Sequence, residues 1–154
     1  MVDEDNTTLV YIIKNPLAFI YNSASPYDWY TNNSIYQNNA LWGDAKSEYN
    51  PCPKGWKIPQ NGTWNDFSNI TMSAIGFGTN VANGRIYNKT AWYPMEGYLH
   101  HQSGQLTYVG YNGYCWLSAI ETIYARYLSF TLSSINPSYP TNRARGFSIR
   151  CIQE

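Results

Sequence analysis

Charged residues are scarce in this chain. Lys, Arg, Asp and Glu make up 13% of its 154 residues, and their formal charges cancel. Proteins that bind nucleic acid or an anionic membrane electrostatically carry an excess of Lys and Arg on one face, which this composition does not supply. The sequence has no apolar run of the roughly 18 residues that span a membrane, and residues 1–5 are acidic where a signal peptide is basic. We therefore expect no nucleic-acid partner and no direct membrane insertion of this chain.

Sequence motifs for catalysis and metal binding are also absent. There is no Cys-x-x-Cys, His-Glu-x-x-His, P-loop or Gly-x-Ser-x-Gly pattern, and no motif links His100 or His101 to a cysteine. Residues 64–66 spell a Trp-Asn-Asp triplet that binds calcium in some sugar-binding proteins, but no Glu-Pro-Asn or Gln-Pro-Asp partner accompanies it. Glu96 and Glu121 could act as a glycosidase pair only if folding brought them together. We expect no enzyme, no cofactor and no metal.

Aromatic residues are abundant, at 17% of the chain, with 15 Tyr and 6 Trp. This content is too high for a disordered chain, and the length predicts one domain covering residues 1–154. The tyrosines have two interpretations. They can be ordinary β-sheet packing residues, or they can form a recognition surface, because Tyr mixed with Ser, Asn and Gly gives large contact area with few rotors to freeze.

The first half of the chain predicts little regular structure. Residues 9–21 hold two apolar runs interrupted at residues 15–16, which predicts a broken opening strand. Residues 22–50, rich in Asn, Ser and Tyr, predict a long loop. The expected anchors of this loop are Trp29, Tyr30, Leu41 and Trp42. Over residues 62–75 apolar side chains recur at the spacing of one helix face, so we expect a helix there with Asn61 as its N-cap.

The second half predicts short strands. After Gly76 apolar segments alternate with glycine turns, and residues 83–84, Asn-Gly, are a strong hairpin signal. Residues 127–132 alternate, with the even positions apolar, and residues 147–151 repeat this pattern. The chain therefore predicts an α+β domain dominated by antiparallel strands.

Three segments carry a resemblance to a known family. They read Asn-Pro-Cys-Pro-Lys-Gly-Trp-Lys-Ile-Pro at 50–59, Gly-Tyr-Cys-Trp at 113–116 and Arg-Ala-Arg-Gly-Phe-Ser-Ile-Arg-Cys at 143–151. With these motifs the chain resembles the Fibrobacter succinogenes major paralogous domain, which occurs in Bacteroides surface proteins and in phage proteins. The resemblance implies a C-type-lectin-like fold of mostly short antiparallel strands with one or two helices, and a binding module instead of an enzyme. It also implies a place on the bacterial cell surface, after export, or on a phage virion.

The resemblance also implies roles for the cysteines. Cys52 and Cys151 match the two motif cysteines and are expected to form a disulfide, the alternative being two buried thiols in a reducing compartment. Cys115 stands where the family has a tyrosine, so we expect it to lie outside the scaffold. The residues expected in the core are Trp56, Trp116 and Phe147.

In many relatives the end of this domain is rewritten by a diversity-generating retroelement, which randomises the adenines of Asn codons. Such codons cannot yield Lys, Glu, Gln, Trp or Met, and after Trp116 the chain has no Lys, Met or Trp. Chance in a Lys-poor protein explains the same absence. The resemblance thus implies a variable ligand-binding region at about residues 111–145. The candidate contact residues are Tyr114, Leu117, Ile120, Glu121, Thr122, Ile123, Tyr124, Tyr127, Ser129, Asn136, Ser138, Tyr139, Thr141, Asn142 and Arg145, with Glu121 as a fixed member.

The expected partner is an unknown protein or glycan on a cell surface, and Tyr124, Tyr127 and Tyr139 are expected to be exposed for it. Two alternatives remain open. A structural or adhesive subunit of a surface pilus or lipoprotein would pack the same face on a neighbouring subunit without variation. An enzyme related to formylglycine-generating or sulfoxide-forming oxidases, which share the fold, would need reactive cysteines or a metal triad, and the sequence shows neither.

Overall fold

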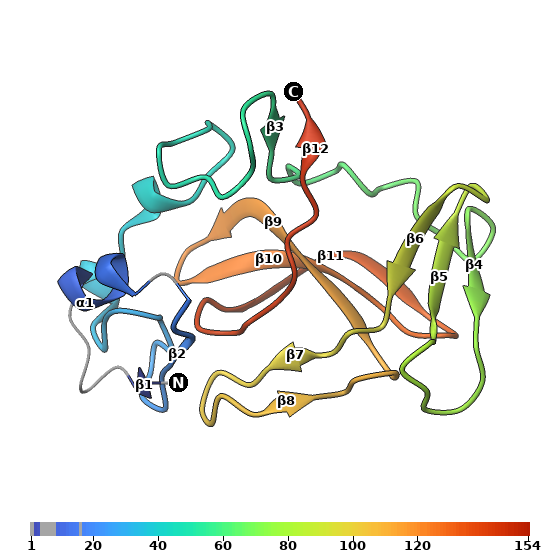
Figure 1. The fold of residues 1–154 in the computed structure, drawn as a ribbon. Helices are drawn as coiled ribbons and strands as arrows, with labels where there is room; N and C mark the ends of the chain where they lie inside the picture. The colour runs from blue at the N-terminus through green and yellow to red at the C-terminus, as the bar shows by residue number, and fades with distance from the viewer. Residues whose placement is uncertain (1, 4–8, 16) are drawn as a thin grey trace.

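The structure, a computed structural model, describes residues 2–3, 9–15 and 17–154, and short antiparallel strands dominate it (Figure 1). Within these residues the helical elements are one short α-helix, α1 (Leu9–Lys14), and two 3-10 turns, η2 (Ser34–Tyr36) and η3 (Asn39–Leu41). The strands are β1 (Val2–Asp3), β2 (Ile20–Tyr21), β3 (Trp56–Lys57), β4 (Met72–Ile75), β5 (Gly84–Tyr87), β6 (Ala91–Pro94), β7 (Tyr98–Leu99), β8 (Leu106–Thr107), β9 (Gly113–Glu121), β10 (Tyr124–Phe130), β11 (Ile135–Asn142) and β12 (Ile152–Gln153). None of the described helices has the length and apolar character needed to cross a bilayer.

The centre of the molecule is an antiparallel sheet with the strand order β11-β10-β9, drawn in orange in Figure 1. A second three-stranded sheet, β4-β5-β6, lies at one end of it. The two-stranded pairs β7–β8 and β12–β3 are antiparallel as well, whereas β1 and β2 pair in parallel. Because β9 and β10 are long and rich in aromatic residues, they form the framework on which the other segments pack.

The central sheet is covered on both faces. Successive side chains of a strand point to opposite faces, so Tyr114 and Trp116 of β9 lie on one side and Cys115 and Leu117 on the other. The first core contains Trp64, Phe67, Met72, Tyr93, Met95, Cys115, Leu117, Leu128 and Phe130. The second core contains Tyr98, Tyr114, Trp116, Ala125, Tyr127 and Phe147. The alternation predicted for residues 127–132 is confirmed, since Leu128 and Phe130 face the first core and Tyr127 the second.

Strand β11 is an edge strand of the central sheet, and it contains Pro137 and Pro140. Proline has no backbone N–H, so neither residue can donate to a further strand. The opposite end of the molecule differs, because the edge strand β4 contains neither proline nor a charged residue. The prolines therefore protect the β11 edge of the central sheet, whereas the β4 edge of the second sheet has no such protection against pairing.

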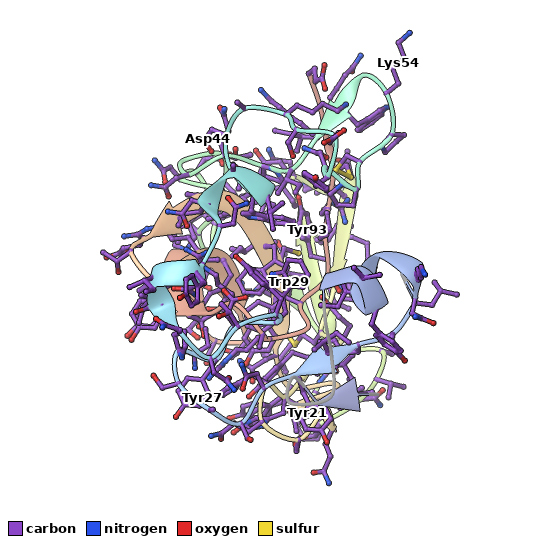
Figure 2. All side chains as sticks on the ribbon, turned by 90° about the vertical axis from the view of Figure 1, so that its left-hand side faces the viewer. Tyr21, Tyr27, Trp29, Asp44, Lys54 and Tyr93 are labelled. Carbon is purple, nitrogen blue, oxygen red and sulfur yellow. A yellow bond between two sulfur atoms is a disulfide. The ribbon has the colours of Figure 1, made fainter. Side chains whose placement is uncertain are left out.

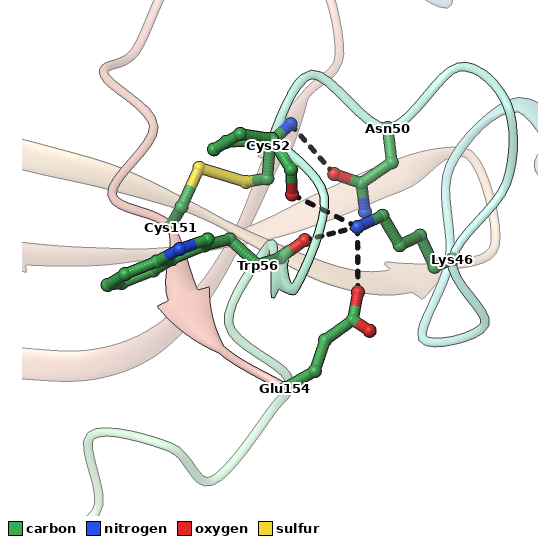
Figure 3. The surroundings of a disulfide bond; sticks show 7 residues. Lys46, Asn50, Cys52, Trp56, Cys151 and Glu154 are labelled. Carbon is green, nitrogen blue, oxygen red and sulfur yellow. Dashed lines mark hydrogen bonds and ion pairs between the residues drawn. A yellow bond between two sulfur atoms is a disulfide. The ribbon is translucent and has the colours of Figure 1, made fainter.

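A disulfide fastens the end of the chain to its middle. Cys52 and Cys151 are joined with a Cα–Cα distance of 5.8 Å, which is the pairing that the family resemblance implies. Beside it, Lys46 Nζ donates to the carbonyl oxygens of Pro53 and Trp56 at 3.1 and 2.6 Å, and to Glu154 Oε1 at 2.7 Å (Figure 3). These contacts hold the motif segment 50–59 against the C-terminus.

Two predictions about which residues lie in the core are wrong. Trp56 is 43% exposed, because it lies on the short outer strand β3 next to Lys46 and not inside either core. Cys115, expected outside the scaffold, is buried in the first core, because the alternation of β9 points it to that face, where a thiol packs as a small apolar side chain. Trp116 and Phe147 are buried, as predicted.

The helix predicted over residues 62–75 is absent, and the segment forms consecutive turns followed by β4. Gly62 has φ of 93°, which ends any helical course, and backbone bonds from Asn65 N to Gly62 O and from Phe67 N to Trp64 O close four-residue turns. Successive turns bring Trp64 and Phe67 inward at the same three-residue spacing as a helix face. Spacing alone could not separate the two structures.

The strand predicted at the start is also wrong in its first half. Leu9–Lys14 is α1, and Asn15 bonds back to Tyr11 O through its backbone N at 3.0 Å and its side chain at 2.9 Å. Pro16 lies outside the described residues. The Asn83-Gly84 hairpin signal is displaced, because Asn83 lies at the end of the 76–83 connection, ahead of β5, and closes it: its Oδ1 accepts from Phe77 N at 3.1 Å and its Nδ2 donates to Gly78 O at 2.7 Å.

Candidate functional site

Four of the fifteen predicted contact residues are buried. They are Tyr114, Leu117, Tyr127 and Thr141. The prediction that these side chains are displayed is wrong because each face of the central sheet is covered by a core. The exposed positions of the predicted set are Thr122, Tyr124, Asn136 and Tyr139. The remaining members are half-buried: Ile120, Glu121, Ile123, Ser129, Ser138, Asn142 and Arg145.

Tyrosine rings form a continuous row along the second core. The row runs through Tyr111, Tyr108, Tyr98, Tyr114, Tyr127 and Tyr139, and we refer to it as the tyrosine row. Consecutive ring centroids lie 5.2 to 6.2 Å apart. Its middle is buried, whereas Tyr111, Tyr108 and Tyr139 are each more than half exposed. The row therefore presents aromatic surface at both ends of a rigid interior.

Phe147 fixes the middle of the row. Its ring stacks on Tyr114 with centroids 4.7 Å apart and an interplanar angle of 5°. It also lies 4.6 Å from the ring of Trp116 and 4.8 Å from that of Tyr127. Packed aromatic rings lose little further entropy when a ligand binds, so their exposed neighbours are held ready for contact.

Arg145 supplies a positive charge to this face. Its guanidinium carbon lies 5.2 Å from the centroid of the Tyr98 ring, and its buried Nε has no hydrogen-bond partner among the described residues. Burial raises the pKa of the hydroxyls of Tyr114 and Tyr127, against the opposing effect of the Arg145 charge. These hydroxyls are therefore neutral groups near a cation. The sequence signal for Arg145 was its place in the motif at 143–151.

Two further predicted residues lie on the same face. The register pairs Tyr114 with Ser129 and Ser129 with Asn136, which places all three across neighbouring strands. Ser129 is half-buried and Asn136 exposed. The structure thus brings together six predicted residues, namely Tyr114, Tyr127, Ser129, Asn136, Tyr139 and Arg145.

Glu121 and Ser138 belong to a different cluster. Arg126 Nη2 lies 2.5 Å from Glu121 Oε2, and Arg126 Nη1 donates to Ser138 Oγ at 3.1 Å. Ser138 Oγ in turn donates to Asn61 Oδ1 at 2.7 Å. Because Arg126 is adjacent to Tyr127 in β10, its side chain points to the opposite face of the sheet. These polar residues therefore hold the strand ends together and lie away from the tyrosine row.

The turn between β9 and β10 is tied to the N-terminal half of the chain. Gln37 Nε2 donates to Ile123 O at 3.2 Å, and Arg143 Nη2 donates to Thr122 O at 2.9 Å. Thr122 has φ of 50°, the left-handed conformation of a tight turn. Tyr124 is exposed beside this turn, and its register partner Asn142 lies 3.2 Å from His101 Nε2 through its side-chain amide.

A cleft of about 530 Å³ lies between the second-core face of the sheet and the N-terminal segments. Its lining comprises Ile12, Trp29, Asn38, Leu41, Trp42, Tyr49, Trp116, Ile120, Ala125, Arg143, Phe147 and Ile149. Figure 2 turns this end of the molecule toward the viewer, with Trp29 near the middle of the face and α1 beside it. The sequence predicted Trp29, Leu41 and Trp42 as loop anchors, but no sequence pattern indicated that they enclose a cleft with Ile120.

Arg143 lies at this cleft with only 9% of its side chain exposed. Its Nη2 donates to Asn39 Oδ1 at 2.7 Å, and its Nη1 is 3.9 Å from Asp28 Oδ2. Burial lowers the pKa of Arg143 and raises the pKa of Asp28, so each partner is kept in an environment that disfavours its charge.

The structure does not arrange the Trp-Asn-Asp triplet for calcium binding or Glu96 and Glu121 for glycoside hydrolysis. Trp64 of the Trp-Asn-Asp triplet is buried, and Asp66 accepts a hydrogen bond from the Tyr87 hydroxyl. Within the described part of the chain no cluster of three His, Cys, Asp or Glu side chains could hold a metal. Glu96 interacts with the backbone of Tyr114 at one end of β9, and Glu121 ends that strand, roughly 20 Å away along an extended chain. That separation is too large for a glycosidase pair.

These features define, over the described residues, a mostly antiparallel β fold with one short α-helix, an aromatic face on its C-terminal sheet and an adjoining cleft. Comparisons with protein-family models, curated proteins and solved structures found no match to this chain.

Proposed function

We propose that this protein is a ligand-recognition domain with a C-type-lectin-like fold, similar to the Fibrobacter succinogenes major paralogous domain, whose C-terminal surface is displayed and diversified by a retroelement. The observation that carries the proposal is the tyrosine row. It places exposed tyrosines on a packed aromatic interior, an arrangement that gives affinity through contact area with little loss of entropy.

The burial pattern narrows the surface that contacts a ligand. The exposed contacts are Tyr124 and Tyr139 from the predicted set, together with Tyr108 and Tyr111, which precede β9. Within the row, buried Tyr127 contacts Tyr139 and buried Tyr98 contacts Tyr108, whereas Tyr124 lies beside the turn between β9 and β10. The ligand is a protein or glycan on a cell surface, and the domain itself is carried on an exported bacterial surface protein or a phage virion, as the family resemblance implies.

A cell-binding assay with matched variants tests this proposal. The labelled protein is titrated onto a panel of bacterial cells and a glycan array, and Tyr139→Ala and Tyr124→Ala are each expected to weaken binding by roughly fivefold or more. Phe77→Ala, in the connection between β4 and β5 and outside the tyrosine row, serves as an exposed aromatic control and is expected to bind as the unchanged protein does. Equal loss in all three variants would argue against a displayed C-terminal surface.

Diversification has its own test in the surrounding genome. A reverse-transcriptase gene and a near-identical template repeat, with differences confined to template adenines, are expected beside the gene. A fimbrial operon without these elements would remove this part of the proposal.

A second candidate function is a subunit of a surface pilus or lipoprotein assembly. Exposed apolar side chains surround the open edge of β4, including Ile70 at 92% exposure and Phe77 at 91%. Ile75 and Val81 extend this surface. Exposed apolar side chains beside an unprotected strand favour contact with a neighbouring subunit. Light scattering after size exclusion tests this, because a Phe77→Ser substitution would dissociate such an assembly and leave cell binding unchanged.

A further inference from the structure

We propose that the 530 Å³ cleft binds an aromatic ring that carries a carboxylate, and that Arg143 holds this carboxylate. The inference rests on the proposed function, because it names the chemistry of a ligand beside the same displayed surface. It is tested on residues that the surface variants do not touch.

The walls of the cleft are suited to a flat ring. Trp29 and Trp42 from the 22–50 segment line it together with Trp116 and Phe147 of the second core, against which Trp42 packs. Trp42 Nε1 donates to Leu117 O at 2.8 Å, which fixes the plane of its indole. Aromatic rings pack in offset or edge-on geometry against such surfaces, and the volume is within the range of small-ligand sites.

Arg143 provides the charge complementarity. It is the charged side chain among the described residues that line the cleft, and no lining carboxylate opposes it. Its buried Nε has no hydrogen-bond partner in the described part of the chain. Asp28 stays at 3.9 Å because its oxygens accept bonds from Gln37 Nε2 at 2.7 Å and Tyr30 N at 3.3 Å. An incoming carboxylate would satisfy a guanidinium donor that the protein leaves unpaired.

The polar content of the lining argues against a neutral sugar. Apart from Arg143, the polar side-chain groups among the described lining residues are the amide of Asn38, the hydroxyl of Tyr49 and three indole N–H groups, of which that of Trp42 already donates to Leu117 O. Several hydroxyls of a sugar ring would lose their water without gaining partners, which is costly. A single anionic group on an apolar ring matches the single cation in an apolar cleft.

The test uses 4-phenylbutyrate and its neutral amide, 4-phenylbutyramide, as probes. Three tryptophans line the cleft, so tryptophan emission reports binding of either probe. The acid is expected to bind roughly tenfold tighter than the amide, which is the size of one charge-assisted hydrogen bond, and to lose this advantage in high salt. The peptide Gly-Gly-Phe and its C-terminal amide form a second arm: tight binding of the peptide acid identifies a chain terminus as the source, and its exclusion identifies a free acid.

Variants locate the effect. Arg143→Gln is expected to remove the preference for the acid, whereas Arg126→Gln, on the opposite face of the same sheet, is expected to retain it. Ala125→Leu, which enlarges a side chain that lines the cleft, is expected to weaken both probes alike. If Arg143→Gln does not fold, the acid and amide comparison on the unchanged protein still decides the matter.

Equal affinity for acid and amide overturns the inference, as does an acid preference that survives Arg143→Gln or the absence of binding at millimolar probe. None of these outcomes affects the proposed function, which depends on Tyr124 and Tyr139 in cell binding. Conversely, loss of the surface effect with an intact acid preference would reject the proposed function alone.

Discussion

Tyr127 and Tyr139 form a matched pair for separating scaffold from surface. They are register partners on β10 and β11, and their rings meet edge to face at 6.2 Å. Tyr127 is 9% exposed and also contacts Tyr114, Trp116 and Phe147, whereas Tyr139 is 54% exposed. Truncation of each to alanine removes the same atoms from two different environments.

The expected stability costs differ severalfold. Tyr127→Ala opens a cavity among four aromatic rings and is expected to lower the free energy of unfolding by about 3 to 5 kcal/mol. Tyr139→Ala removes strand propensity and one edge contact, for a cost of about 1 kcal/mol or less. Tyr127→Phe is expected to change stability by no more than about 0.5 kcal/mol, because no described residue hydrogen-bonds the Tyr127 hydroxyl.

Urea denaturation monitored by circular dichroism measures these differences. At this chain length each kcal/mol corresponds to roughly 2 to 4 °C in Tm, so thermal melts give a second reading. The m-value of each variant checks that the unfolding transition remains comparable. If Tyr127→Ala costs no more than Tyr139→Ala, the burial of the row's middle is wrong and Tyr127 returns to the displayed surface.

Four further predictions concern the cysteines, a histidine and calcium. Reducing the Cys52–Cys151 bridge, which spans a sequence separation of 99, should lower the free energy of unfolding by about 4 to 5 kcal/mol in denaturant titrations; a cost below about 1 kcal/mol would contradict its role. Cys115 should resist iodoacetamide in the native protein and react on unfolding, since burial raises the pKa of its thiol to about 12. Burial lowers the pKa of His101 to about 4, so the unfolded state takes up the proton first and stability should fall by on the order of 1 to 2 kcal/mol as pH drops from 7.5 to 5, a slope that His101→Gln should reduce. Calcium and chelators should leave Tm unchanged, and a chelator-induced drop of several degrees would restore the calcium reading.

The sequence predicted the parts of the fold that depend on local pattern. The alternation over residues 127–132 identified a strand, and Trp116 and Phe147 were placed in the core. The sequence could not predict that both faces of the central sheet are covered by a core. Tyr127 alternates with Leu128 as a surface residue would, and only the packing of Phe147 from a distant segment buries it.

Tertiary context also explains the errors in local structure. Trp64 and Phe67 imitate a helix face because successive turns place them in the same core. The candidate site was predicted as a set of positions in residues 111–145, and the structure divides that set between two faces of one sheet. The cleft was missed because Trp29 and Arg143 are brought together by folding and share no motif.

The prolines of β11 bear on how such a surface could change without harm. Under the proposed diversification, a new set of side chains at Asn136, Ser138 and Tyr139 would in some cases raise the aggregation propensity of β11, and an unprotected backbone edge would add to it. Pro137 and Pro140 lack a backbone N–H, so they hinder pairing at this edge whatever side chains stand beside them. Under the proposed diversification, the side chains of β11 would vary while Pro137 and Pro140 hinder its backbone edge from pairing with another copy of the protein.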